Sequence, residues 1–323
     1  MRLLPVLLLL LAPGCSAPSH SSSSSSSGGP STVPTVPPTV CNGHAELCGR
    51  AYDAVTFPGT HDAYATHAGQ FLAADQTYAM ARQLADGVRV LHLEIQPNGG
   101  APSLCHGSCA IGNQPLVDGL REILGFVEGH PAELVSLLME TKDVTRDEVA
   151  SAMKTSGLLP YLHAQTLGAP WPTVGAMLDK GERVVAFLAA DGGSHPTLLD
   201  RWSFTWETPW NNQTLDDFKR CDADRGQMSN GIYVVDTYLE DAPIQTATNA
   251  ARVNVNPFLV DRLRLCHDTT KRLPNFAMVN YYEVGDLLVS VDMINGFTPA
   301  PPFNDADFPP GQDGGADGGD AGP

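Results

Sequence analysis

The chain has 323 residues and a formal net charge of -17 at pH 7, with 36 Asp and Glu residues against 19 Lys and Arg residues. Such an acidic balance argues against nucleic acid as a partner, because binding to a phosphate backbone depends on Lys and Arg. It also disfavours docking onto anionic lipid from solution, so we expect any membrane contact to depend on an anchor.

The N-terminal residues carry one positive charge, at Arg2, followed by a short apolar run that ends at Leu11. This pattern predicts a signal peptide over residues 1–14, since a membrane-spanning helix needs about 20 apolar residues. Small residues then lead to Cys15, which resembles the lipobox cysteine of bacterial lipoproteins, although Ala12 stands where leucine is usual. We expect an exported protein, either a bacterial envelope lipoprotein acylated at Cys15 or a secreted protein cleaved nearby.

The cysteine count supports acylation of Cys15, because the chain has seven cysteines and six remain to pair if one carries lipid. Proximity along the chain predicts three disulfides: Cys41 with Cys48, Cys105 with Cys109, and Cys221 with Cys266. Other pairings of six cysteines stay possible at this stage. A zinc site is the weaker alternative, because the sequence contains no C-x-x-C spacing.

Composition divides the remainder into a linker, a body and a tail. Residues 15–40 are dominated by Ser, Pro, Thr and Gly without apolar periodicity, which predicts an unstructured linker. Residues 300–323 are rich in Gly, Asp and Pro and contain no basic residue, and we expect a disordered acidic tail rather than calcium-binding repeats. Between them, residues 41–299 have the size of one large α/β domain.

Short apolar runs alternate with longer amphipathic ones throughout the body, which is typical of β/α units. The predicted strands are residues 54–57, 88–95, 103–105, 134–139, 183–188, 204–206, 232–236 and 276–280. The predicted helices are residues 70–85, 116–128, 146–154, 174–178, 244–265 and 284–294. This alternation predicts a single (β/α)8 TIM-type barrel, irregular where two links are short and poor in helix.

Polar side chains follow or occupy the first four predicted strands. In TIM-type barrels the catalytic groups lie at the carboxyl ends of the strands and on the loops that follow. Two residues that are two apart on a strand point to the same face, as His92 and Glu94 do on the second predicted strand. The barrel prediction therefore brings six chemically capable side chains to one mouth: His61, Asp62, His92, Glu94, His106 and Glu140.

Four stretches of the body resemble the phosphatidylinositol-specific phospholipase C X-box superfamily. They are FPGTHDAY at 57–64, QLADGVR at 83–89, LCHG at 104–107 and LLME at 137–140. Residues 171–173, 206–209 and 275–286 are similar to its secreted bacterial, fungal and plant branch. The resemblance covers the entire body and implies a phospholipase C-like phosphodiesterase on a TIM barrel.

The superfamily pattern implies an acid–base pair, with His61 as the general base and His106 as the general acid. The base deprotonates the attacking hydroxyl and the acid protonates the departing oxygen, which would otherwise leave as a poor alkoxide. Histidine suits both roles because its pKa lies near neutrality. In phosphatidylinositol a neighbouring inositol hydroxyl can attack, which gives a cyclic phosphate and releases diacylglycerol.

The resemblance also implies a divalent cation, because carboxylates occupy the two positions at Glu94 and Glu140 where calcium-dependent members carry ligands. Asp62 would be a third oxygen ligand, and Ca²⁺ is the expected ion, with Mg²⁺ or Mn²⁺ as alternatives. His92 departs from the pattern, since nitrogen is a poor ligand for calcium, and it keeps manganese or zinc open. In a metal-free alternative, Lys142 faces the phosphate and Glu140 is its partner.

Two further residues have supporting roles in this interpretation. Asn280 stands where relatives often carry aspartate, so activity is reduced or Asp62 supplies the charge for His61. Arg89 is expected to be structural or an ion partner of one of the acids.

The leading substrate is a phosphatidylinositol-like phospholipid or its head-group diester. Glycerophosphodiester or sphingomyelin hydrolysis and a barrel that binds without turnover are the alternatives. We expect a monomer that contacts the membrane through an anchor on Cys15.

Overall fold

The computed structural model describes residues 38–241 and 245–301. The predicted signal peptide, Cys15, the linker up to residue 37 and the acidic tail from residue 302 lie outside the described residues. No helix in the described part of the chain combines the length and the apolar character that crossing a bilayer requires.

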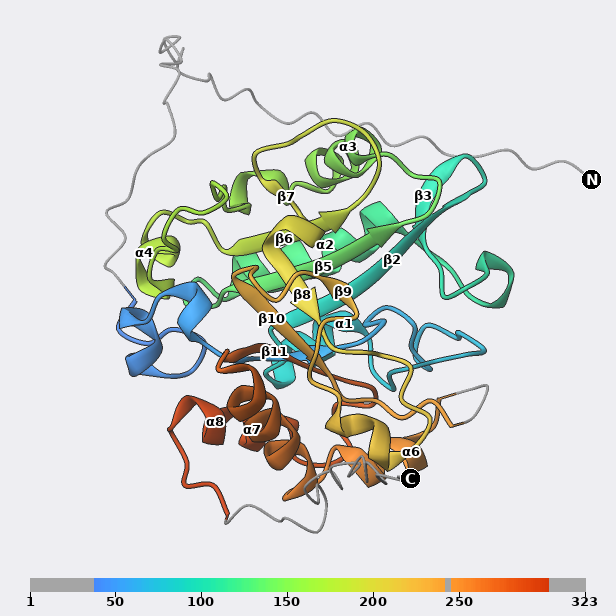
Figure 1. Cartoon of the computed structure of the whole chain (residues 1–323). Helices are drawn as coiled ribbons and strands as arrows, with labels where there is room; N and C mark the ends of the chain where they lie inside the picture. The colour runs from blue at the N-terminus through green and yellow to red at the C-terminus, as the bar shows by residue number, and fades with distance from the viewer. Residues whose placement is uncertain (1–37, 242–244, 302–323) are drawn as a thin grey trace, which may run out of the picture. The chain divides into compact units, whose positions relative to one another are not determined.

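Parallel strands in barrel order form the centre of the fold (Figure 1). These strands are β1 (Phe57–Thr60), β2 (Val90–Asn98), β5 (Val135–Thr141), β6 (Val184–Ala189), β7 (Leu198–Asp200), β8 (Thr205–Glu207), β10 (Ile232–Asp236) and β11 (Pro274–Val279). They pair in the order β7-β6-β5-β2-β1-β11-β10-β8, and within the described residues no ladder joins β7 to β8. The predicted TIM-type fold is therefore confirmed, as a curled and incompletely closed barrel.

Three short strands lie outside the parallel set: β3 (Ala101–Leu104), β4 (Gln114–Pro115) and β9 (Arg225–Gly226). Strand β3 turns back antiparallel to the end of β2 through Gly99 and Gly100, which both have positive φ and suit a tight turn. The prediction of a third barrel strand at residues 103–105 is therefore wrong. The barrel strand missed by the sequence is β7, whose three residues are too short to show a pattern.

Helices cover the outside of the barrel and its ends (Figure 1). The α-helices are α1 (Met80–Asp86), α2 (Leu116–Gly129), α3 (Arg146–Ser156), α4 (Val174–Asp179), α5 (Arg201–Phe204), α6 (Ala247–Val253), α7 (Phe258–Thr270) and α8 (Leu287–Asn295). The 3-10 helices are η1 (Ala45–Gly49), η2 (Tyr52–Ala54), η3 (Cys109–Ile111), η4 (Leu159–Tyr161) and η5 (Leu215–Lys219).

Two predicted helices differ from those observed. The helix expected over residues 244–265 is interrupted before Pro257, which lacks an amide proton and stands at the N-cap of α7. The helix expected from residue 70 begins only at Met80. The preceding segment folds back on itself instead, with the Asp75 and Gln76 amides both donating to the Ala65 carbonyl.

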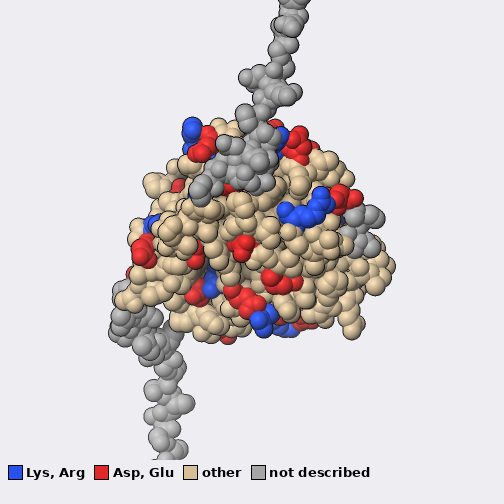
Figure 2. Space-filling model, turned by 90° about the horizontal axis from the view of Figure 1, so that it is seen from below, with Lys and Arg blue, Asp and Glu red and all other residues tan. Residues whose placement is uncertain are grey.

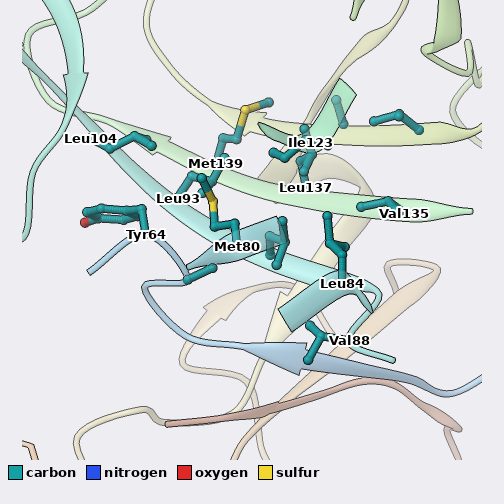
Figure 3. Packing of buried hydrophobic residues seen from close by; sticks show 14 of the residues in the cluster. Tyr64, Met80, Leu84, Val88, Leu93, Leu104, Ile123, Val135, Leu137 and Met139 are labelled. Carbon is teal, nitrogen blue, oxygen red and sulfur yellow. The ribbon is translucent and has the colours of Figure 1, made fainter. Parts of the chain in front are cut away.

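Side-chain alternation along β2 separates the core from the functional groups. Leu91 and Leu93 point outward and pack in a buried apolar cluster with Val135, Leu137 and residues of α1 and α2 (Figure 3). The alternate positions His92 and Glu94 line the cavity inside the barrel instead. The register pairs Glu94 with Glu140 of β5, so both carboxyl groups reach the same end of the barrel.

The three disulfides predicted from proximity are confirmed. Cys41–Cys48, Cys105–Cys109 and Cys221–Cys266 have Cα–Cα distances of 5.1, 4.8 and 5.1 Å, as disulfide geometry requires. The second of them closes a short loop that contains His106.

Candidate active site

A cavity of about 280 Å³ opens at the carboxyl ends of the barrel strands. Its walls come from β2, β5, β8, β9, β10 and β11, from the loops that follow β1, β3, β8 and β10, and from α5. All six side chains that the sequence brought to one mouth line it: His61, Asp62, His92, Glu94, His106 and Glu140.

His61 is positioned by the end of β1. Its amide donates to the Val279 carbonyl at 3.0 Å, and its ring nitrogen Nδ1 lies 3.0 Å from Asn280 Oδ1. The ring stacks on Tyr238 with centroids 4.3 Å apart. Gly59 allows β1 to pack closely against β2, because a Cβ at position 59 would lie 2.9 Å from Val90 Cβ.

Asp62 is buried at the centre of the cluster, and its φ of 39° is a sparsely populated conformation for a non-glycine residue. Its Oδ1 lies 3.0 Å from His92 Nδ1. Its Oδ2 lies 3.7 Å from His61 Nε2 and 3.4 Å from His106 Nε2. Burial disfavours the charged form of Asp62, but the imidazoles, with His61 foremost, outweigh burial and hold its pKa below the usual range.

His106 approaches the same carboxylate from the loop after β3. Its Nδ1 lies 2.7 Å from the Ala73 carbonyl, which can only accept, so Nδ1 carries a proton and Nε2 faces the cavity. Burial lowers the pKa of both His106 and His61. The carboxylates of Asp62 and Asp75 outweigh burial at each ring and raise the pKa above its ordinary value.

The two predicted functional residues of β2 differ in their environment. His92 is held between Asp62 and Glu140, with its Nε2 3.5 Å from Glu140 Oε1. Glu94 has no ion pair among the described residues and faces the cavity, where burial and the charge of Asp62 raise its pKa.

Glu140 belongs to an ion-pair network that the sequence analysis missed. Arg201 Nη1 lies 2.5 Å from one Glu140 oxygen, and Arg225 Nη1 lies 2.8 Å from the other. Both arginines also bind the buried Glu207, with Arg201 Nη2 at 2.7 Å from its Oε2. The ring of Trp202 lies against both guanidinium groups. Glu207 falls within the stretch at 206–209, but neither arginine belongs to a local motif.

The end of strand β10 and the segment that follows it add a second set of missed residues at two-residue spacing. Asp236, Tyr238 and Glu240 all line the cavity. Asp236 is buried and its Oδ2 has no hydrogen-bond partner in the described part of the chain. Burial and the nearby charge of Glu207 raise the pKa of Asp236 to about 7.

Two predicted site residues lie elsewhere. The Arg89 guanidinium lies 2.7 Å from Glu133 and donates to backbone carbonyls near α1, so it has the structural role expected and does not pair with an acid of the site. Lys142 is exposed and does not line the cavity. The cationic partners of Glu140 are Arg201 and Arg225 instead.

The predicted calcium ligands fit the structure only in part. Glu140 is not a free ligand, because each of its oxygens already binds an arginine. Among the described residues, two sets of three side chains have possible metal-ligand atoms within 4.8 Å of one another. His61, Asp62 and His92 form one set, and Asp62, Asp75 and His106 form the other, so each set contains histidine. Acidic side chains nevertheless outnumber arginines around the cavity, so Asp62 and Glu94 remain reasonable cation ligands.

The family model described as PI-PLC X 1 matches residues 47–295. A PI-PLC X domain-containing protein 1 of Arthroderma benhamiae is 29% identical, over 82% of this chain and 92% of that protein. An uncharacterized secreted protein of the same species is 27% identical over 78% of this chain, which spans 62% of that protein. A PI-PLC X domain-containing protein of Arabidopsis thaliana is 23% identical over 77% of this chain and 63% of its own length.

Two solved structures share the fold. The phosphatidylinositol-specific phospholipase C of Listeria monocytogenes superposes with a TM-score of 0.53 at 15% identity, over 77% of this chain and 95% of that chain. The enzyme of the same name from Staphylococcus aureus gives a TM-score of 0.53 at 15% identity, over 78% and 95%.

Proposed function

The chain belongs to the PI-PLC X family, and we propose that it is a phosphodiesterase that cleaves a phosphatidylinositol-like glycerophospholipid or its head-group diester. The observation that carries the proposal is the convergence of His61 and His106 on one cavity. Both rings lie within 3.7 Å of the same Asp62 oxygen through Nε2, and each ring is held by a hydrogen bond at Nδ1.

These hydrogen bonds at Nδ1 leave both Nε2 atoms available to exchange protons with the substrate. The Asn280 oxygen accepts from His61 Nδ1, which leaves the Nε2 lone pair to take the proton of an attacking hydroxyl. The Ala73 carbonyl accepts from His106 Nδ1, and when this ring is protonated, a form that the carboxylates of Asp62 and Asp75 favour, its Nε2–H can protonate the departing oxygen. In phosphatidylinositol, an inositol hydroxyl forms the new P–O bond while the bond to diacylglycerol breaks. The proton passes from the hydroxyl to His61, and His106 gives one to the diacylglycerol oxygen.

Charge around the cavity supports a divalent cation as part of this proposal. Arg201 and Arg225 are already neutralised by Glu140 and Glu207, and further acids face the cavity. An anionic diester would be repelled from such a site unless protons or a cation offset the acids. When held by Asp62 and Glu94, the ion would neutralise phosphoryl oxygens and lower the pKa of the adjacent imidazoles.

Export is the second part of the proposal. Three disulfides suit an oxidising compartment, and one relative is named as a secreted protein. We infer that the protein acts outside the cytoplasm, with Cys15 as the attachment point if it is acylated.

The test is a product analysis by ³¹P NMR with the full-length protein. Phosphatidylinositol, glycerophosphoinositol, phosphatidylcholine and sphingomyelin are each presented with EDTA, Ca²⁺, Mg²⁺ or Mn²⁺. We expect an inositol phosphate from the first two substrates in the presence of a cation. Cleavage of sphingomyelin alone would reassign the head group, and cleavage of no diester under any condition would overturn the proposal.

His61→Ala and His106→Ala should each lower kcat by about 10²- to 10⁴-fold, the usual contribution of a general acid or base. His267→Ala is the matched control, because His267 is exposed on α7 and does not line the cavity. A cleavage rate that survives either cavity substitution would exclude the acid–base pair while leaving the fold assignment intact.

A further inference from the structure

Asp75 is a buried carboxylate that the mechanism above does not use. Its side chain is 1% exposed, and neither oxygen has a hydrogen-bond partner among the described residues. Oδ2 lies 3.4 Å from His61 Nδ1 and 3.7 Å from His106 Nε2, so both imidazoles flank it at ion-pair distance. A buried carboxylate without hydrogen bonds is costly, and its persistence between two imidazoles points to a functional role.

The loop between β1 and α1 fixes the backbone of Asp75. Its amide donates to the Ala65 carbonyl at 2.8 Å, and its carbonyl accepts from the Tyr281 amide at 2.8 Å. The Gln76 side chain donates to the carbonyls of His61, at 2.8 Å, and Val279, at 3.1 Å. The hydrogen bonds of Asp75 and its neighbour Gln76 therefore fix this loop to two segments. One is the segment after β1 that contains His61, and the other is the end of β11.

The same loop holds His106. The Ala73 carbonyl receives the His106 Nδ1 proton at 2.7 Å, and the next carbonyl, of Ala74, accepts from the Tyr281 hydroxyl at 2.7 Å. One short segment thus orients the ring of His106 and places the carboxyl group of Asp75 beside His61.

The two groups at His61 Nδ1 supply different properties. Asn280 Oδ1 is closer, at 3.0 Å, and accepts the proton, but an amide carries no charge. Asp75 is farther away but ionisable, and Asp62 lies on the Nε2 side of the ring. When His61 takes a proton, the Nδ1 side of the resulting imidazolium therefore faces two groups. The Asn280 amide, after β11, orients the ring, and the Asp75 carboxyl group, in the loop before α1, lies beside it.

We propose that Asp75 is a positioning residue that supplies the negative charge for the imidazolium form of His61, while Asn280 fixes its tautomer. The inference rests on the proposed function, in which His61 is the general base. It assigns the charge to the loop before α1 rather than to the last barrel strand or to Asp62.

A charge swap tests this assignment with Asp75→Asn, Asn280→Asp and the double variant. Asp75→Asn should lower kcat by about 10- to 100-fold with KM nearly unchanged, because part of the acid–base contribution is lost. Adding Asn280→Asp should restore most of kcat, since the new carboxylate touches the same Nδ1. Asn280 Nδ2 has no hydrogen-bond partner in the described residues, so the change to aspartate sacrifices none.

Histidine ¹⁵N NMR gives a second readout that needs no turnover. The His61 signals, assigned by their loss in His61→Ala, should shift in Asp75→Asn and return toward wild type in the swap. Asp292→Asn is the matched control, because it removes an Asp–His pair of 3.1 Å that does not line this cavity. Asp75→Ser serves as a second variant if Asp75→Asn does not fold.

The outcomes separate the two proposals. If the wild type cleaves diesters but Asp75→Asn keeps full kcat, or if the swap restores nothing, the role of Asp75 is overturned and the proposed function stands. If the wild type cleaves nothing, the proposed function fails, and unchanged His61 signals in Asp75→Asn would exclude the charge pairing as well.

Discussion

At the level of single residues, the cavity holds more negative charge than its arginines balance, and Asp236 shows the consequence most directly. It is buried on β10, its Oδ2 has no hydrogen-bond partner among the described residues, and Glu207 is the charged residue with the largest effect on its pKa. Burial and that charge raise its pKa to about 7. Such a group lowers stability whenever the pH forces it to ionise, which is typical of residues retained for function.

The substitution Asp236→Asn should raise stability at pH 8 and leave it nearly unchanged at pH 4. In the unfolded chain this carboxyl loses its proton near pH 4, whereas the folded protein keeps the proton until about pH 7. Rising pH between these values therefore favours the unfolded chain, and the penalty is complete above the folded pKa. Removing the carboxyl should contribute on the order of one to a few kcal/mol at pH 8.

Urea unfolding at pH 4, 6 and 8, with EDTA present throughout, measures the effect. Asp292→Asn, remote from the cavity, should show no such increase with pH. An equal gain for Asp236→Asn at pH 4 and pH 8 would mean that side-chain packing, and not ionisation, sets the difference.

The site could be predicted from sequence where its residues follow strands in recognisable stretches. Their positions at the ends of strands were enough to predict that His61 and Glu140 share a cavity. The two-residue spacing of His92 and Glu94 along one strand predicted that both side chains also face it. Their chemical roles stay predictions. Asp75 could not be found this way, because its loop had the composition of a helix and its use depends on folding back to β11.

At the level of elements, two disulfides have different effects, one on the stability of the fold and the other on the geometry of the site. Cys221–Cys266 joins residues 45 apart, next to the buried Arg262, and Cys105–Cys109 joins residues 4 apart around His106. The entropy that a crosslink removes from the unfolded chain grows with loop length. The long crosslink should therefore act mainly on stability and the short one mainly on the geometry of the site.

Paired alanine substitutions separate these effects. Removing Cys221–Cys266 should cost about 4 kcal/mol by loop entropy and leave kcat of the folded protein nearly unchanged. Removing Cys105–Cys109 should cost about 2 kcal/mol but lower kcat by about 10-fold or more, because small displacements of catalytic groups are expensive. Denaturant unfolding and diester cleavage measure the two quantities, and an equal loss of kcat in both variants would contradict this division.

Fold prediction failed where elements were too short, were interrupted, or gave way to a loop that folds back, as before α1. Alternation of apolar runs predicted the barrel, because each buried strand pairs with a helix that covers it. It could not separate β3 from a barrel strand, since a three- or four-residue run has the same composition whether it runs parallel or antiparallel. Strand β7 was missed for the same reason, and it lies where the ladder stays open.

At the level of the whole molecule, charge sets how the protein meets a lipid surface. The net charge is -17, and on the face shown in Figure 2 most basic side chains lie singly beside acidic ones without a continuous basic patch. A vesicle of phosphatidylinositol is itself anionic, so the long-range interaction between the two is repulsive. The proposed reaction on vesicles must overcome this repulsion, whereas a small soluble diester meets much less of it.

Cleavage of phosphatidylinositol vesicles by protein lacking a lipid anchor should therefore speed up with salt. Raising NaCl from 0.01 to 0.15 M shortens the screening length from about 30 to about 8 Å, and we expect kcat/KM to rise by about 3-fold or more. Glycerophosphoinositol is the control substrate, and its rate should change less over the same range. Both series keep the divalent cation constant, so that screening is the variable. A vesicle rate that falls with salt would instead require a basic docking surface on another face of the molecule.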